Sequence, residues 1–151
     1  MPRIVRDANV VWEGTISRGA GVVEGTSSGA FALPVTIASR VGDPEGKTSP
    51  EELLAAAHAT CYVTSLGGEL ARARTPPELL DVHCTITMDE VQGLGHRIVA
   101  SSIVASGVVP GCDSAAFAQA AEAADQGCSF SALIRASATV TIDANLEQGG
   151  G

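Results

Sequence analysis

Aromatic side chains are scarce in this sequence, and so are positive charges. Phe, Tyr and Trp make up only 3% of the 151 residues although 45% are hydrophobic. Ala, Val and Leu must therefore supply most of the packing of a core that suits one domain. Nine Lys and Arg stand against 17 Asp and Glu, a formal net charge of −8. Because such a chain repels nucleic acid and anionic lipid, we expect neither as a partner.

Long apolar runs are also missing. Residues 1–5 contain no apolar run of signal-peptide length, and no stretch approaches the roughly 20 apolar residues that cross a bilayer. We therefore expect a cytoplasmic protein without a membrane partner. In that reducing compartment, cysteines are usually reactive, metal-bound or buried rather than joined in structural disulfides.

The cysteines lack the spacing of a metal site. Cys61, Cys84, Cys112 and Cys128 form no CxxC pair, and no Cys/His pair has zinc-finger spacing. A structural metal is therefore not expected.

The order of the expected elements predicts an α+β fold. Val-, Ile- and Thr-rich segments bounded by turn residues predict six strands: residues 4–14, 19–25, 33–40, 80–90, 96–108 and 136–146. Ala- and Leu-rich segments predict helices: residues 50–72, 113–126 and 128–134. Because hairpins dominate this order, the sheet is expected to be largely antiparallel. No repeat or linker divides the chain, and we expect a single domain over residues 1–151.

The first helix has the clearest start. Ser49 stands at the capping position, Pro50 at the first helical position and Glu52 two residues further on, which is a capping box. The helix is expected to end before Pro76-Pro77, which cannot continue it.

That helix also concentrates the candidates for chemistry. Glu51, Leu54, His58 and Cys61 are spaced 3, 4 and 3 residues apart and share one stripe. The spacing alone favours a buried stripe with Cys61 as a small core residue. A reactive thiolate in mid-helix would need a cation from elsewhere, because the dipole of its own helix acts only at the ends.

Two arginines could supply the cation, and an acid could assist. Arg18 and Arg40 lie in segments with few other basic residues, although either can equally be a solvated charge. Glu51 stands ten residues before Cys61, roughly 15 Å along the helix axis. If the two act in one site, Glu51 must therefore come from a second subunit.

Cys128 has a second set of possibilities. It starts the short helical segment, and a helix N-terminus would lower the pKa of its thiol and expose it, as a resolving cysteine requires. An ordinary buried cysteine is the alternative. Cys84 alternates with core residues of a strand, and Cys112 follows a Pro-Gly turn, so neither is expected to react.

Several segments resemble one family. Residues 48–61, TSPEELLAAAHATC, look like the helix signature of the OsmC/Ohr peroxidases, and residues 127–133, GCSFSAL, resemble that family's second motif. Residues 12–14, WEG, with Arg18-Gly19 resemble the OsmC branch, as does VVPG at residues 108–111. The resemblance runs in order over nearly the whole chain.

The resemblance implies a fold and roles for the candidates. The fold would be an intertwined homodimer with antiparallel sheets wrapped around a central helix. Cys61 would be the peroxidatic thiolate, oxidised to a sulfenic acid and then joined to Cys128 in a disulfide. Glu51 and an arginine would hold the thiolate and orient the peroxide at the subunit interface. Arg40 fits the family's position better than Arg18, which also remains a candidate.

The resemblance also implies the reactants. The substrates would be organic hydroperoxides and hydrogen peroxide, the reductant a dithiol or a dihydrolipoyl protein, with no bound cofactor, in defence against oxidative and osmotic stress. Two positions depart from the family. Ser129 stands where Pro is usual, so that the helix start at Cys128 is less firmly set. Cys112 replaces an aliphatic residue and adds a thiol that could compete for disulfide formation.

Two other functions use the same residues. A non-catalytic redox sensor or small-ligand-binding dimer would need Cys61 without turnover. An esterase-like hydrolase would use Cys61 and His58 as nucleophile and base. Side chains three residues apart on a helix meet poorly in those roles, and no third group is evident to orient His58.

Overall fold

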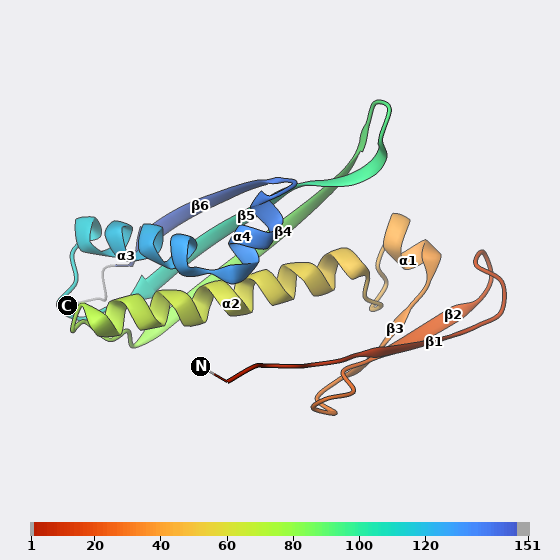
Figure 1. Cartoon of the computed structure of the whole chain (residues 1–151), viewed down its shortest axis with the longest axis horizontal. Helices are drawn as coiled ribbons and strands as arrows, with labels where there is room; N and C mark the ends of the chain where they lie inside the picture. Colours follow the sequence, from red (N-terminus) through yellow and green to blue (C-terminus); the bar gives the residue numbers. More distant parts are fainter. Residues whose placement is uncertain (1, 148–151) are drawn as a thin grey trace. The chain divides into compact units, whose positions relative to one another are not determined.

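The computed structural model describes residues 2–147. The chain divides into two compact units between residues 53 and 54. The first unit holds a small sheet and a short helix, and the second holds a longer sheet with further helices (Figure 1).

The first unit is a three-stranded antiparallel sheet. Its strands β1 (Asn9–Glu13), β2 (Ala20–Glu24) and β3 (Ala32–Val35) pair in the order β1-β2-β3. The predicted first strand began at residue 4, which is too early. Asn9 pairs with Glu24, the last residue of β2, so the residues before it have no partner in the ladder.

The predicted third strand, residues 33–40, is wrong in its second half. Residues Ile37–Val41 form the helix α1. Thr36 caps it, because its side chain accepts a hydrogen bond from the Ser39 N–H while the Ser39 hydroxyl accepts one from the Thr36 N–H. This reciprocal cap overrides the β preference of the Ile-containing sequence.

The helix α2 (Pro50–Arg72) begins where predicted. The Ser49 hydroxyl accepts a hydrogen bond from the Glu52 N–H at 3.2 Å, but the Glu52 carboxylate accepts one from the Thr48 hydroxyl at 2.8 Å. One half of the capping box is therefore present and the acid stabilises the preceding residue instead. Among the described residues, none of the helices combines the length and the apolar character needed to cross a membrane.

The second unit is built on a mixed sheet in the order β4-β5-β6. Strands β4 (Leu79–Val91) and β5 (Gly95–Val108) form the predicted antiparallel hairpin. Strand β6 (Thr139–Leu146) pairs with β5 in parallel. The helices α3 (Ser114–Gly127) and α4 (Ser129–Arg135) form the crossover that a parallel pair requires. The predicted α+β class is confirmed, with one parallel pair in the otherwise antiparallel sheets.

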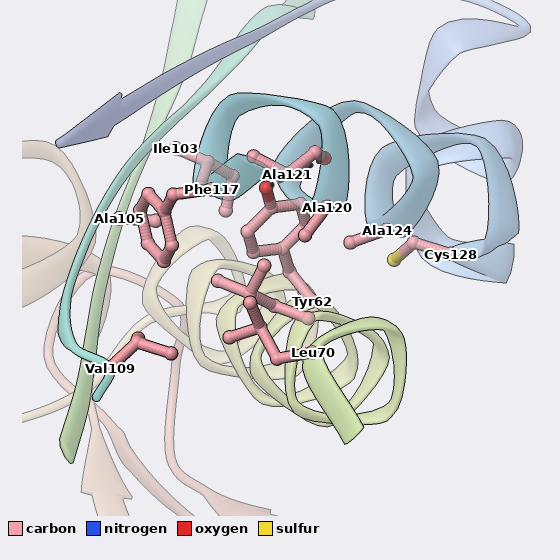
Figure 2. Packing of buried hydrophobic residues seen from close by; sticks show 11 residues of the cluster. Tyr62, Leu70, Ile103, Ala105, Val109, Phe117, Ala120, Ala121, Ala124 and Cys128 are labelled. Carbon is pink, nitrogen blue, oxygen red and sulfur yellow. Dashed lines mark hydrogen bonds between the residues drawn. The ribbon is translucent and has the colours of Figure 1, made fainter. Parts of the chain in front are cut away.

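The core of the second unit lies among α2, α3 and β5. Tyr62, Leu66 and Leu70 on α2 are fully buried, and Figure 2 shows Tyr62 directed toward Ala121 on α3. The Tyr62 hydroxyl donates a hydrogen bond to the Ala121 carbonyl at 3.0 Å. Cys128 belongs to this cluster, at the junction of α3 and α4. The core thus holds one of the two candidate cysteines in a fixed position beside α2.

Candidate active site

The structure brings Cys61 and Cys128 together. Their sulfur atoms lie 3.3 Å apart although 67 residues separate them in the sequence. Cys61 projects from the middle of α2, and Cys128 is the N-cap residue of α4. Both are free thiols. Because a disulfide has an S–S bond of about 2.0 Å, only a small movement would join them.

The thiol of Cys61 is the more acidic of the two. Partial burial raises its pKa, but hydrogen bonds to the sulfur act in the opposite direction and outweigh burial. The donors are the backbone N–H groups of Phe130 and Ser129, the Cys128 thiol and the Ser129 hydroxyl, which lies 3.9 Å from the sulfur. The pKa of Cys61 therefore lies below its ordinary value. The donors come from the N-terminus of α4, whereas sequence reasoning looked only for a cation.

Of the two possibilities for Cys128, the structure shows the buried cysteine and not the exposed thiol of lowered pKa. Cys128 is 1% exposed, and burial raises its pKa despite hydrogen bonds from the N–H and hydroxyl of Ser131. The proximity of Cys61 raises it further. A helix N-terminus can lower the pKa of a thiol, but here desolvation prevails. Because the two pKa values are shifted in opposite directions, Cys61 loses its proton before Cys128 as the pH rises.

The helix start at this site does not depend on proline. With Ser129 in the position that the family usually gives to Pro, α4 still begins at that residue. The sulfur of Cys128 accepts a hydrogen bond from the Ser131 N–H at 3.4 Å and so caps the helix. Unlike proline, Ser129 also keeps a backbone N–H that it directs to Cys61.

The first unit brings Arg40 and Glu51 together. The guanidinium donates two hydrogen bonds to the carboxylate, at 3.1 and 2.9 Å, and this raises the pKa of Arg40. Arg40 also lines an apolar cavity of about 350 Å³ whose other walls include Trp12, Val35 and Leu53. A guanidinium at the wall of an apolar pocket suits a ligand with one polar end and one apolar end.

The other candidates occupy separate places. Arg18 lies in the exposed turn between β1 and β2, where its N–H donates to the Thr15 hydroxyl at 3.3 Å. Cys84 packs against the core, as expected, and burial raises the pKa of its thiol. Burial also raises the pKa of Cys112, whose sulfur donates to the Asp113 carbonyl at 3.4 Å.

Sequence reasoning missed the surroundings of His58. The ring is fully buried, with Nδ1 2.6 Å from the Ser101 hydroxyl and Nε2 2.8 Å from the Ser131 hydroxyl. Burial lowers the pKa of His58. Because both ring nitrogens are bonded to serines, the Cys61–His58 pair of an esterase is not formed. Ser101 alternates with Ile103 on β5, and this period of two could have marked it as an inward-facing polar residue.

Comparison with known proteins identifies the family. Residues 42–143 match the family described as OsmC-like protein. Over 136 residues, the chain is 32% identical to peroxiredoxin OsmC of Escherichia coli (strain K12). The matched segment covers 90% of this chain and 92% of that protein. The protein of the same name in Shigella flexneri gives the same values.

Solved structures agree in fold. The organic hydroperoxide resistance protein OsmC of Legionella pneumophila matches with a TM-score of 0.73 and 18% identity, over 95% of this chain and 99% of that one. The organic hydroperoxide resistance protein OhrB of Bacillus subtilis matches with a TM-score of 0.72 and 18% identity, over 92% of this chain and 98% of that one.

These matches define the class of protein first: an α+β fold that this chain shares with OsmC and Ohr proteins. The chain belongs to the OsmC-like family. Its relationship to peroxiredoxin OsmC makes it a member of the thiol-dependent peroxidases.

Proposed function

We propose that the chain reduces organic hydroperoxides, and also hydrogen peroxide, through a Cys61 thiolate, a sulfenic acid and a Cys61–Cys128 disulfide. The observation that carries this proposal is the 3.3 Å sulfur–sulfur contact between two thiols whose pKa values are shifted in opposite directions. Cys61 would attack the peroxide as a thiolate, and Cys128 would stay a thiol until it forms the disulfide.

The first step is the oxidation of Cys61. Its thiolate attacks one oxygen of the peroxide, the S–O bond forms as the O–O bond breaks, and the second oxygen leaves as an alcohol or water after taking a proton. Only the thiolate is an effective nucleophile. The lowered pKa of Cys61 therefore increases the reactive fraction at neutral pH.

The second step forms the disulfide. Cys128 attacks the sulfur of the Cys61 sulfenic acid, the S–S bond forms, and the hydroxyl group leaves as water. A small external dithiol or a dihydrolipoyl protein then reduces the disulfide. Since Cys128 is 1% exposed and Cys61 is more open, the reductant attacks the Cys61 sulfur.

The peroxide is assigned to Arg40 and Glu51, in preference to Arg18. The bidentate ion pair fixes the guanidinium, and the cavity that Arg40 lines offers apolar walls for an alkyl chain. Glu51 precedes Cys61 by ten residues on α2, about 15 Å of helix. An intertwined homodimer of one-domain chains, each spanning residues 1–151, would bring the pair of one subunit to the thiolate of the other.

The test is hydroperoxide consumption by the wild type and by Cys61→Ser. Cumene hydroperoxide is the substrate, and dithiothreitol or dihydrolipoamide is the reductant. Cys112→Ser is the matched control, since it also replaces a partly buried thiol by a hydroxyl, away from the pair.

We expect turnover in the wild type and the control, and none in Cys61→Ser. Turnover that survives in Cys61→Ser would contradict the assignment of the nucleophile. No turnover in the wild type, with one oxidation of Cys61 per chain, would instead indicate a redox sensor.

A further inference from the structure

Three buried polar side chains form a hydrogen-bonded network beside Cys128. His58 on α2, Ser101 on β5 and Ser131 on α4 are all 0% exposed. The imidazole bonds one serine through each ring nitrogen, Ser101 at 2.6 Å and Ser131 at 2.8 Å. Burying polar groups is unfavourable unless every one is paired, and apolar residues would fill the same space without that requirement. Stability alone therefore does not explain why polar residues occupy these positions.

Ser131 connects this hydrogen-bonded network to the thiol pair. Its backbone N–H donates to the Cys128 sulfur at 3.4 Å, and its hydroxyl lowers the pKa of the Cys128 thiol as a second donor to that sulfur. The same hydroxyl bonds Nε2 of His58. One hydroxyl thus bridges a thiol and an imidazole, and a hydroxyl can donate one proton while it accepts another.

The resolving step needs a proton acceptor at this place. Burial keeps Cys128 as a thiol, which is a poor nucleophile. With 1% of its surface exposed, Cys128 has little access to a base in the solvent. The imidazole is in place to accept the proton, because its Nε2 lies 2.8 Å from the Ser131 hydroxyl. Burial lowers the pKa of His58, which favours the neutral ring that has a free nitrogen lone pair.

We propose that His58, acting through the Ser131 hydroxyl, accepts the proton of Cys128 when Cys128 attacks the oxidised Cys61. The inference rests on the proposed peroxidase cycle. Once Cys61 is oxidised, the Cys128 thiol turns its hydrogen from Cys61 to the Ser131 oxygen, and the Ser131 hydroxyl turns its own hydrogen from the Cys128 sulfur to Nε2 of His58. The thiol proton then passes to the Ser131 oxygen as the proton of Ser131 passes to Nε2. The S–S bond forms, the S–O bond of the sulfenic acid breaks, and the departing hydroxide takes a proton from the solvent on the more open side of Cys61 to become water. The imidazolium then returns its proton to solvent through the same hydroxyl.

The surroundings of His58 fit this role. For Nε2 to accept, Nδ1 must carry the hydrogen and donate it to the Ser101 oxygen, and the 2.6 Å contact serves that tautomer. The charge of the imidazolium would be attracted by Asp125 on α3 and opposed by Arg135 on α4. Cys84 on β4, 3.8 Å from Nδ1, stays a thiol because burial raises its pKa. His58 is thus a positioning residue for Cys128.

The test separates the two chemical steps by rapid mixing. The protein is mixed with one equivalent of cumene hydroperoxide between pH 5.5 and 8.5, and quenched samples are analysed by mass spectrometry for dimedone-trapped sulfenic acid and for disulfide. The variants are Ser131→Ala, which removes the bridge, and His58→Gln, whose amide can still hydrogen-bond but cannot titrate. Tyr62→Phe is the matched control, since it also removes a buried hydroxyl from a hydrogen bond.

We expect sulfenic acid to accumulate in Ser131→Ala and His58→Gln, with disulfide formation slowed about 100-fold, the lower range of general base catalysis. In the wild type, disulfide formation should slow as the pH falls through the low pKa of His58. In both variants this dependence should disappear, and the rate should instead rise toward alkaline pH as Cys128 itself ionises. Tyr62→Phe should keep the wild-type profile.

Three results would overturn the inference. One is wild-type disulfide formation in Ser131→Ala. Another is disulfide formation that slows as much in Tyr62→Phe as in Ser131→Ala and His58→Gln, with all three variants keeping the wild-type pH profile. That result would indicate that these residues only support the structure. The third applies even if neither variant folds: a rate of disulfide formation in the wild type that rises only with the alkaline ionisation of Cys128, without any fall at low pH from His58. A wild type that forms no sulfenic acid overturns the peroxidase cycle as well, and so is distinct from the first three results.

Discussion

Replacing Ser129 by proline should weaken the activation of Cys61 without breaking α4. Ser129 is the first helical residue, where the N–H has no partner within the helix and proline is tolerated. Cys128 before it has φ −83° and ψ 113°, the extended conformation that a residue before proline prefers. The substitution thus removes one N–H from the Cys61 sulfur, together with the hydroxyl.

The magnitude follows from that lost hydrogen bond. A bond to a charged group is worth about 1.5–3 kcal/mol, and since Cys61 is partly exposed and a sulfur accepts weakly, we take about 1 kcal/mol. The N–H of Phe130 remains. Losing a donor destabilises the thiolate and so raises the pKa of Cys61. Below that pKa, the ratio of thiolate to thiol should fall about fivefold.

The assay is thiolate absorbance at 240 nm as the pH is raised. The first thiolate to form belongs to Cys61, because the pKa values of Cys84, Cys112 and Cys128 are raised by burial. Ser129→Ala is the matched control, since it removes the hydroxyl and keeps the N–H. Identical titrations of the two variants would refute the assignment of the N–H, provided that circular dichroism shows α4 intact.

Three further changes test the pair, the peroxide site and the core. Cys128→Ser should allow a single oxidation of Cys61 but slow turnover at limiting thiol; unchanged turnover would remove Cys128 from the mechanism. Arg40→Ala should raise the KM for cumene hydroperoxide severalfold with little change in Tm, since a partly exposed ion pair contributes about 1 kcal/mol or less. The same KM effect in the control Arg18→Ala, and not in Arg40→Ala, would reverse the assignment. Leu66→Ala, at a fully buried position, should lower the free energy of unfolding in urea by about 2–5 kcal/mol. Leu94→Ala, at a position 59% exposed, should change it by about 0.5 kcal/mol or less, and equal effects would contradict the placement of the core.

The sequence indicated elements more reliably than their ends. The helix α2 was found because Ser49 and Pro50 mark its start locally. The helix α1 was missed because Ile37 suits a strand and the Thr36–Ser39 cap was not weighed against it. The parallel pairing of β6 could not be read from hairpin spacing, since it depends on how α3 and α4 return the chain.

The site divides in the same way. Local sequence identified Cys61 as a candidate, but spacing alone favoured a core residue. Its pairing with Cys128 came from the family resemblance, because no local rule relates positions 67 residues apart. The two possibilities for the pKa of Cys128 stayed open, because a helix N-terminus is visible in a sequence and the burial of that N-terminus is not. The partners of His58 lie on β5 and α4, so they too appear only after folding.

One short helix gives the two thiols different properties. Cys128 is the cap of α4, so it is buried with the helix end and keeps its proton. Cys61 approaches the same helix end from α2 and meets the N–H groups of Ser129 and Phe130, which stabilise its thiolate. The first N–H groups of a helix lack partners within it, and the two sulfurs accept different ones: Cys128 that of Ser131, and Cys61 those of Ser129 and Phe130. The proposed order of reaction, first Cys61 and then Cys128, therefore rests on which N–H groups of the α4 N-terminus each sulfur accepts.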